Sequence, residues 1–211
     1  MNNARKRLWS LAHAERAALA RDLAGLGVDQ WATGSLCGRW NVEEVVAHLT
    51  AAASVGPARW VASVLGSGFD FDVHNDRRLA EHRGTTPAET LARFRAIQTS
   101  TTSTFGPVEA WVGDVLIHGQ DIRHPLGIVH DVDVAAATAV AGFLSKGDFT
   151  VPSKSNIAGL RLEATDGPFA GGAGPLVSGT TLALVMAMAG RGAYCRQLAG
   201  EGVETLHARC S

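Results

Sequence analysis

The stretch GDVLIHGQDIRHPLG, residues 113–127, combines the apolar spacing of a buried helix with an unusual number of polar groups. Within it, Asp114 and His118 are four residues apart. On an α-helix this spacing places two side chains on one face, about 6 Å apart along the axis, so both can reach one cation. Pro125 and Gly127 close the pattern, as they do at the end of many helices. The stretch therefore predicts a helix that carries two potential metal ligands.

A third ligand has to come from another helix, and His48 is the candidate. It lies in VVAHL, residues 45–49, where an imidazole without a partner would be costly among apolar neighbours. Two histidines and a carboxylate are a typical donor set for a catalytic zinc or similar divalent ion, which keeps one position open. Two simpler interpretations remain: Asp114 and His118 form an i, i+4 ion pair, or Glu44, four residues before His48, is the carboxylate.

Two further polar side chains of the opening stretch have open roles. Asp121 either orients His118 from behind the metal or pairs with Arg123. His124 lies near the predicted helix end, which favours a solvated or charged role. The sequence assigns neither of them to catalysis.

The composition of the chain limits the kinds of protein that it can be. The chain has 211 residues, 46% hydrophobic and 18% charged, with a formal net charge of -1. This balance predicts a folded protein and gives no electrostatic reason to expect binding to nucleic acid or to an anionic membrane. No segment approaches the roughly 20 apolar residues that span a bilayer, and charges interrupt the N-terminal segment where a secretory signal would be apolar. The cysteines lack CxxC spacing, so we expect free thiols in a reducing, cytoplasmic setting; they are Cys37, Cys195 and Cys210.

Apolar periodicity and capping signals predict a mainly helical N-terminal part. Asn41 with Glu44 forms a capping-box pattern, and Thr86-Pro87 is a second helix start. Residues 28–40 are expected to form an ordered loop. The predicted helices cover residues 5–26, 42–66 with a bend at Gly56-Pro57, 75–84, 86–104, 108–122 and 132–146.

The pattern changes after residue 157. Residues 159–166 and 203–209 alternate apolar and polar side chains as strands do, and residues 178–191 resemble a capped helix. The segment GPFAGGAGP, residues 167–175, is expected to be an exposed turn-rich loop. We therefore predict a helical domain over residues 1–146 and a small α/β domain over residues 157–211.

Four segments together carry a resemblance to a known family. The blocks RWNVEEVVAHL and WVGDVLIHGQDIRHPLG, followed by GPLVSGTTLALVMAMAGR and LAGEGVETLHAR, resemble the DinB-like mycothiol-dependent maleylpyruvate isomerase family in its actinobacterial branch. The likeness extends from Trp9 to Arg209. It implies an α+β fold: a DinB-like four-helix bundle of the up-down-down-up type with a small C-terminal α/β domain.

The resemblance also implies a cofactor and a cosubstrate. A divalent metal, usually zinc with nickel as an alternative, would be held by His48, Asp114 and His118. The characterised isomerase has glutamate where this chain has Asp114, so the metal geometry can differ. Mycothiol would be the thiol cosubstrate, and Arg191 is the candidate for binding it, in a cleft between bundle and C-terminal domain. The partners implied are a small electrophilic substrate and a monomeric or homodimeric chain.

The leading functional hypothesis is a metal-dependent, mycothiol-using isomerase or S-transferase. Its chemical basis is that a cation stabilises a thiolate near neutral pH, and a thiolate adds to double bonds or displaces leaving groups. One alternative is a non-catalytic metal-binding DinB-like protein. Another is a metal-dependent hydrolase, in which the open position activates water. No catalytic residue beyond the ligands is assigned.

Overall fold

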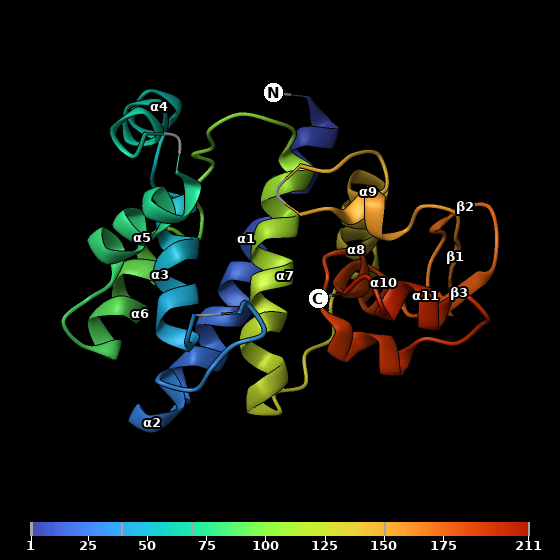
Figure 1. The fold of residues 1–211 in the computed structure, drawn as a ribbon. Helices are drawn as coiled ribbons and strands as arrows, with labels where there is room; N and C mark the ends of the chain where they lie inside the picture. Colours follow the sequence, from blue (N-terminus) through green and yellow to red (C-terminus); the bar gives the residue numbers. More distant parts are fainter. Residues whose placement is uncertain (1, 39, 69, 150, 211) are drawn as a thin grey trace. The chain divides into compact units, whose positions relative to one another are not determined.

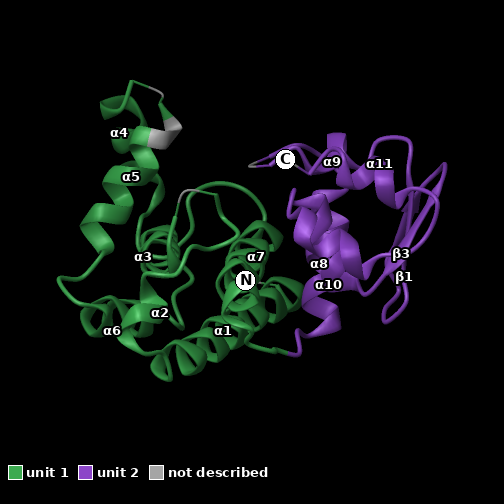
Figure 2. Ribbon diagram, turned by 60° about the horizontal axis from the view of Figure 1, so that its bottom comes forward, with its two compact units in different colours: residues 1–130 green, residues 131–211 purple. Residues whose placement is uncertain are grey.

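The chain divides into two compact units, residues 1–130 and residues 131–211 (Figure 2). Each unit is described by itself. The computed structural model describes residues 2–38, 40–68, 70–149 and 151–210.

A four-helix bundle forms the centre of the first unit. Helix α1 (Asn3–Ala24) packs against α6 (Pro87–Ala96) and α7 (Val108–Leu126), and α3 (Val42–Ala52) packs against the same two helices. The four helices therefore enclose one core (Figure 1). This arrangement confirms the predicted helical bundle. Its largest fully buried apolar side chains include Trp9, Leu19, Leu23, Phe94, Leu116 and Ile122.

The helix that carries His48 begins as the sequence predicts. The Asn41 side chain accepts a hydrogen bond of 2.9 Å from the Glu44 backbone N–H, and Glu44 Oε2 accepts one of 2.9 Å from the Asn41 N–H. This reciprocal capping box satisfies two backbone donors that the first turn leaves unpaired. Helix α3 ends at Ala52, and Pro57 starts a separate helix, α4 (Pro57–Gly66), so the predicted single bent helix is wrong. Proline cannot continue the backbone ladder but is well suited to the first helical position.

Helix α6 also begins at the predicted cap, Thr86, but ends earlier than predicted, at Ala96 rather than near residue 104. The following residues bind other elements instead of extending the helix. Ser100 Oγ donates to the Ala53 carbonyl at 2.8 Å, and the Ser100 carbonyl accepts from the buried Arg16 at 2.7 Å. The Ser100 carbonyl, which a longer α6 would have paired within its own backbone, is thus satisfied by Arg16.

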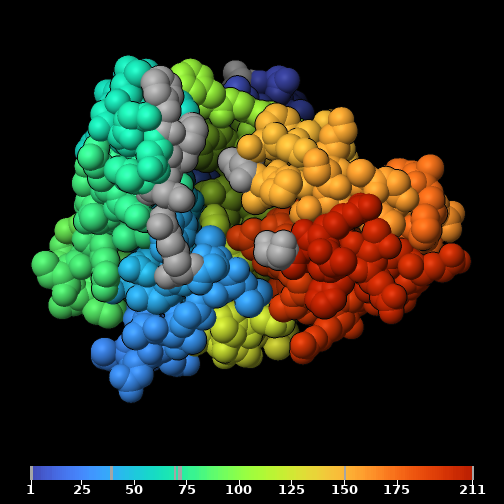
Figure 3. Space-filling model, in the orientation of Figure 1, coloured from blue at the N-terminus to red at the C-terminus, as the bar shows by residue number. Residues whose placement is uncertain are grey.

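Helices α2 (Val28–Trp31) and α5 (Phe71–His82) complete the first unit. Helix α2 lies within the segment predicted as a loop, and α5 packs on α3 and begins a few residues before its predicted start. The side chains of α4 and α5 form part of the surface of this unit (cyan to green in Figure 3), where Val61 and Leu65 are exposed. Among the described residues, no helix combines the length and the apolar character needed to cross a membrane.

The second unit begins before the predicted boundary. Helix α8 (Val134–Leu144), which the sequence assigned to the bundle, packs against α10 (Thr181–Met188). Both helices are strongly apolar, and α10 is buried over nearly its whole length. Helix α8 therefore covers α10, and the compact units divide at residue 130 rather than between residues 147 and 157. The remaining short helices are α9 (Ser153–Asn156), η1 (Gly192–Gln197) and α11 (Val203–His207).

A small mixed sheet completes the second unit. Strand β1 (Arg161–Ala164) lies between β2 (Ala170–Gly172), which is antiparallel to it, and β3 (Leu176–Gly179), which is parallel. Only β1 was predicted. The predicted strand at residues 203–209 is wrong, because these residues form α11. Val203 and Leu206 are three residues apart, so the same apolar residues also match one face of a helix, and Leu206 is fully buried.

Two glycines allow β2 and β3 to lie on opposite sides of β1. Between β2 and β3 the chain has to pass the start of β1 within a few residues. Gly172 and Gly174 make this turn possible with positive φ values of 76° and 126°. A Cβ on Gly174 would lie 2.1 Å from the Gly159 carbonyl oxygen. The predicted glycine-rich loop is indeed exposed from residue 170 to residue 175, but Phe169 is buried.

Replacement of Gly174 by alanine is therefore expected to destabilise the second unit. The backbone conformation alone costs about 1–3 kcal/mol for a residue with a Cβ, and the clash adds to it. Gly171→Ala is the matched control, because a Cβ there meets nothing within 4 Å. Urea unfolding of both variants measures the difference. Equal stability of the two would show that the crossing does not depend on glycine.

Candidate metal centre

The three predicted ligands converge in the first unit. His48 comes from α3, and Asp114 and His118 come from consecutive turns of α7. Asp114 Oδ1 lies 3.7 Å from His48 Nε2 and 3.8 Å from His118 Nε2. One donor atom from each of the three residues lies within 4.8 Å of the others. All three side chains are half-buried.

These distances fit a single divalent ion. Two donors of a tetrahedral zinc, each about 2.0–2.1 Å from it, lie about 3.3 Å apart. The two measured separations exceed this by a few tenths of an ångström, which side-chain rotation can supply. Asp114, although one methylene shorter than glutamate, has an oxygen close to both imidazoles. The donor set of two nitrogens and one carboxylate oxygen suits zinc and related ions.

His118 is held in place by Asp121. Its Nδ1 lies 2.9 Å from Asp121 Oδ2, and the Asp121 side chain is fully buried. With Asp121 ionised, the Nδ1–H donates to it, so Nε2, on the side of Asp114, is the nitrogen that can bind a metal once it loses its proton. The sequence left this role open for Asp121. On the other ligand, the Trp40 ring contacts the His48 ring with centroids 4.8 Å apart.

A proline in α7 explains how a distant loop reaches the site. Pro125 lies inside the helix and has no backbone N–H, so it cannot donate to the carbonyl of Asp121. Instead, the Leu36 backbone N–H donates a hydrogen bond of 3.0 Å to the Asp121 carbonyl oxygen. This bond docks the loop before α3 onto α7 and brings Cys37 to His118. Cys37, His118 and Asp121 form a second group of potential metal donors within 4.8 Å of one another.

The charges around the cluster favour ionised forms. Burial alone would raise the pKa of Asp114, but His48, His118 and the buried Arg16 lower it below its usual range. Burial would lower the pKa of His118, yet the hydrogen bond to Asp121, together with Cys37 and Asp114, raises it to about 10. Since metal ligation needs a neutral imidazole, metal binding here has to release a proton.

Neither Cys37 nor Arg16 was predicted as part of the site. Arg16 comes from α1, is 4% exposed, and donates to the Ser100 and Ile97 carbonyls at 2.7 and 3.4 Å. No local pattern links either residue to α7, because their positions follow from helix packing and from the docked loop. The spacing of a sequence motif carries no information about such contacts.

The other candidate residues lie outside the cluster. The Glu44 carboxylate accepts from the Asn41 backbone and lies 3.8 Å from an Arg83 nitrogen. His124 is exposed on the last turns of α7. Arg191 lies in the second unit, where Nη1 donates to the Ala189 carbonyl at 2.7 Å. Its role in thiol binding stays a prediction.

Replacement of Asp121 by asparagine should weaken metal binding by about 10- to 100-fold, the usual cost of losing a carboxylate behind a ligating histidine. An asparagine in the same place no longer fixes the charge and tautomer of His118. Zinc competition with a chromophoric chelator measures the change, and Asp133→Asn, at the exposed cap of α8, serves as control. An unchanged affinity would remove Asp121 from the site.

The fold and the cluster define a class of protein: a DinB-like helical bundle, joined to a small mixed domain, with two histidines and one aspartate gathered between two bundle helices. Residues 12–115 match the family model described as "Mycothiol maleylpyruvate isomerase N-terminal domain". Residues 12–115 therefore form a domain of this family.

Solved structures show the same fold. The crystal structure of the mycothiol-dependent maleylpyruvate isomerase aligns with a TM-score of 0.59 and 16% sequence identity, over 93% of this chain and 92% of that chain. A histidine-to-alanine mutant of the mycothiol-dependent maleylpyruvate isomerase aligns over the same shares with a TM-score of 0.58 and 16% identity. At this identity the likeness shows a common fold. No curated protein sequence matches the chain.

Proposed function

We propose that this protein is a divalent-metal-dependent enzyme that uses mycothiol as a thiol cosubstrate, acting as an isomerase or an S-transferase on a small electrophile. The observation that carries the proposal is the convergence of His48, Asp114 and His118 within a bundle of this family. These residues would hold the metal, zinc or nickel. When bound, the cation supplies positive charge that stabilises a thiolate near neutral pH.

The residues of the chain perform the remaining tasks. Asp121 keeps the His118 Nδ1 proton in place and directs Nε2 towards the ligand cluster. Trp40 packs on the His48 ring and limits its rotation. The buried cation of Arg16 supports the ionised form of Asp114. This preorganisation leaves little side-chain freedom to be lost when the reactants bind.

Arg191 is the proposed thiol-binding residue. A guanidinium can donate hydrogen bonds to the hydroxyl or amide oxygens of a polar thiol cosubstrate. Loss of a charged hydrogen bond of this kind costs about 1.5–3 kcal/mol, or roughly 10- to 100-fold in affinity. Arg191→Ala should therefore raise KM for the thiol by this factor and leave zinc affinity unchanged.

A thiol-dependence assay tests the proposal. Zinc-loaded protein is mixed with maleylpyruvate or with an alkyl halide electrophile, in the presence of mycothiol, glutathione or no thiol. We expect turnover with mycothiol only, and its loss in His118→Ala. Turnover without any thiol would favour the metal-dependent hydrolase. Zinc binding without turnover of any electrophile would favour the non-catalytic metal-binding protein.

A further inference from the structure

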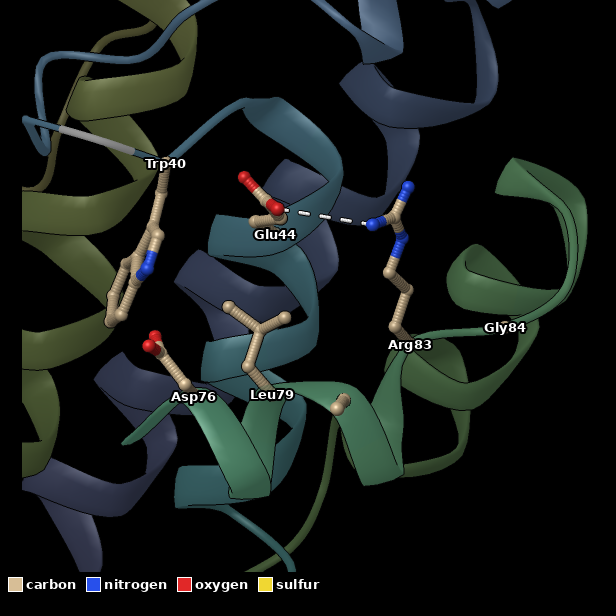
Figure 4. Close-up of a pocket in the computed structure, with 7 residues that line it drawn as sticks. Trp40, Glu44, Asp76, Leu79, Arg83 and Gly84 are labelled. Atoms are coloured by element: carbon tan, nitrogen blue, oxygen red, sulfur yellow. Dashed lines mark ion pairs between the residues drawn. The ribbon is translucent and has the colours of Figure 1, made fainter. Parts of the chain in front are cut away.

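A pocket of about 510 Å³ lies beside the ligand cluster in the first unit, within the size range of small-molecule sites. It opens between the start of α3 and one face of α5. Figure 4 shows Leu79 between Trp40 and Asp76 on one side and Arg83 on the other. The lining consists of Trp40, Glu44, Asp76, Leu79, Ala80, Arg83 and Gly84.

One residue belongs to both the pocket and the metal centre. Trp40 lines the pocket, and its ring also contacts the ring of His48 at 4.8 Å. A molecule that packs on Trp40 in the pocket is therefore separated from a proposed metal ligand by no more than one aromatic side chain. A substrate with its non-reacting part in the pocket would have to pass the edge of the Trp40 ring to bring its reacting atom to the ligand cluster.

The charge of the lining selects among ligands. Glu44 and Asp76 contribute carboxylates, and Arg83 is the cation among the lining residues. Arg83 already pairs with Glu43 at 2.8 Å and lies 3.8 Å from Glu44. The 9% exposed carboxylate of Glu43 cannot be left without its partner at low cost. A ligand carboxylate would thus have to compete for Arg83 and face further negative charge.

The remaining surface is apolar. Trp40 offers an aromatic face, and Leu79 and Ala80 extend the apolar surface along α5. Carboxylate oxygens accept hydrogen bonds, so Glu44 and Asp76 match hydroxyl or amine donors on a ligand. An ammonium group near an aromatic face gains a further attraction.

We propose that this pocket binds the non-reacting part of the electrophilic substrate, and that it selects neutral or cationic groups with hydrogen-bond donors on an aromatic or apolar ring over carboxylates. The term substrate rests on the proposed function. The pocket itself does not, because its ligand preference can be measured without thiol and without turnover. The inference also means that a dicarboxylate such as maleylpyruvate is a poor substrate of this chain.

The binding test uses three probes with one ring and different charge: 4-nitrobenzylamine, 4-nitrobenzyl alcohol and 4-nitrobenzoate. Binding to the zinc-loaded full chain at pH 7 is followed by calorimetry and by quenching of tryptophan fluorescence. We expect the amine to bind most tightly and the benzoate at least about tenfold more weakly than the amine, which equals about 1.4 kcal/mol. Equal or tighter binding of the benzoate, or no binding of any probe, overturns the proposal.

A pair of variants on α5 locates the effect. Asp76→Asn removes a lining carboxylate and should reduce the difference between amine and benzoate at least threefold. Glu81→Gln is the matched control, because Glu81 lies on the same helix, pairs with Arg59 and Arg78, and is not among the lining residues. The control should keep the full difference. An unchanged difference in Asp76→Asn would show that the probes bind elsewhere.

A turnover test separates this inference from the proposed function. The electrophiles 4-(bromomethyl)benzamide and 4-(bromomethyl)benzoate share one reacting carbon; the thiol sulfur bonds to it, bromide leaves and the thiol proton goes to solvent. We expect kcat/KM at least about tenfold higher for the amide. A preference for the benzoate overturns the pocket assignment while keeping a thiol transferase. Probe binding without turnover of either halide excludes the S-transferase form of the proposed function and leaves the pocket in place.

Discussion

His48→Ala is expected to lower zinc affinity by more than about 100-fold, because loss of a ligand costs more than loss of the group behind it. The His48 side chain is 19% exposed, so its removal leaves only a modest cavity. The free energy of unfolding of the metal-free protein should change by no more than about 1–2 kcal/mol. Chelator competition measures the affinity, and denaturant unfolding in the presence of a chelating agent measures the stability.

A matched pair on α7 completes this experiment. His118→Ala should lose zinc as His48→Ala does. His124, six residues further along the same helix, is exposed, so His124→Ala should bind zinc as the unmodified protein does. Full zinc content in His48→Ala would mean that another group, such as Glu44, is the ligand. The Glu44→Gln variant then decides the question, since only a ligand role for Glu44 predicts a loss of zinc.

Arg123→Leu is expected to destabilise the first unit by up to about 3–5 kcal/mol, because it leaves the buried Glu15 and the partly buried Asp22 without this cation. Arg123 is 1% exposed and holds α7 to α1 through Asp22, at 2.7 Å from Nε. Glu15 lies 3.9 Å from Arg123 Nη1, is itself buried, and pairs with His130 at 3.0 Å. Urea unfolding monitored by circular dichroism measures the loss.

Two further variants distinguish charge from packing. Asp22→Asn added to Arg123→Leu should restore part of the stability, because it removes one of the unpaired charges. Arg95→Leu, at an exposed position on α6, should change stability by no more than about 0.5 kcal/mol. If Arg123→Leu is as mild as Arg95→Leu, the ion pairs between α1 and α7 do not hold the bundle together.

Local sequence signals predicted the helix starts and the spacing of two site residues. Asn41 with Glu44, and Thr86 with Pro87, are recognisable because a helix cap involves residues within four positions of each other. Asp114 and His118 are on one face of α7 for the same reason, since the helical repeat fixes the relation of residues four apart. His48 was predicted as the third metal ligand from the cost of burying an imidazole without a partner and from the likeness to a family.

The short elements were not predictable in this way. Residues 203–209 carry both patterns over few positions: Leu206 and Ala208 alternate with polar residues as in a strand, whereas Val203 and Leu206 share one face of a helix. The small sheet depends on which strand β1 can reach. The glycines of residues 170–175 were assigned to a loop, yet Gly172 and Gly174 also let β3 cross to the far side of β1. Pairing partners are chosen by contacts between distant segments, and these have no local pattern.

The sequence by itself determined the bundle, because apolar periodicity and caps act within a few turns of one helix, and it determined that Asp114 and His118 share a face. The tertiary structure alone decided what surrounds them. Arg16 reaches the site from α1, and Cys37 reaches it because Pro125 frees a carbonyl that Leu36 then binds. Such neighbours are set by the packing of helices and the docking of a loop, whose energies come from surfaces far apart in the chain.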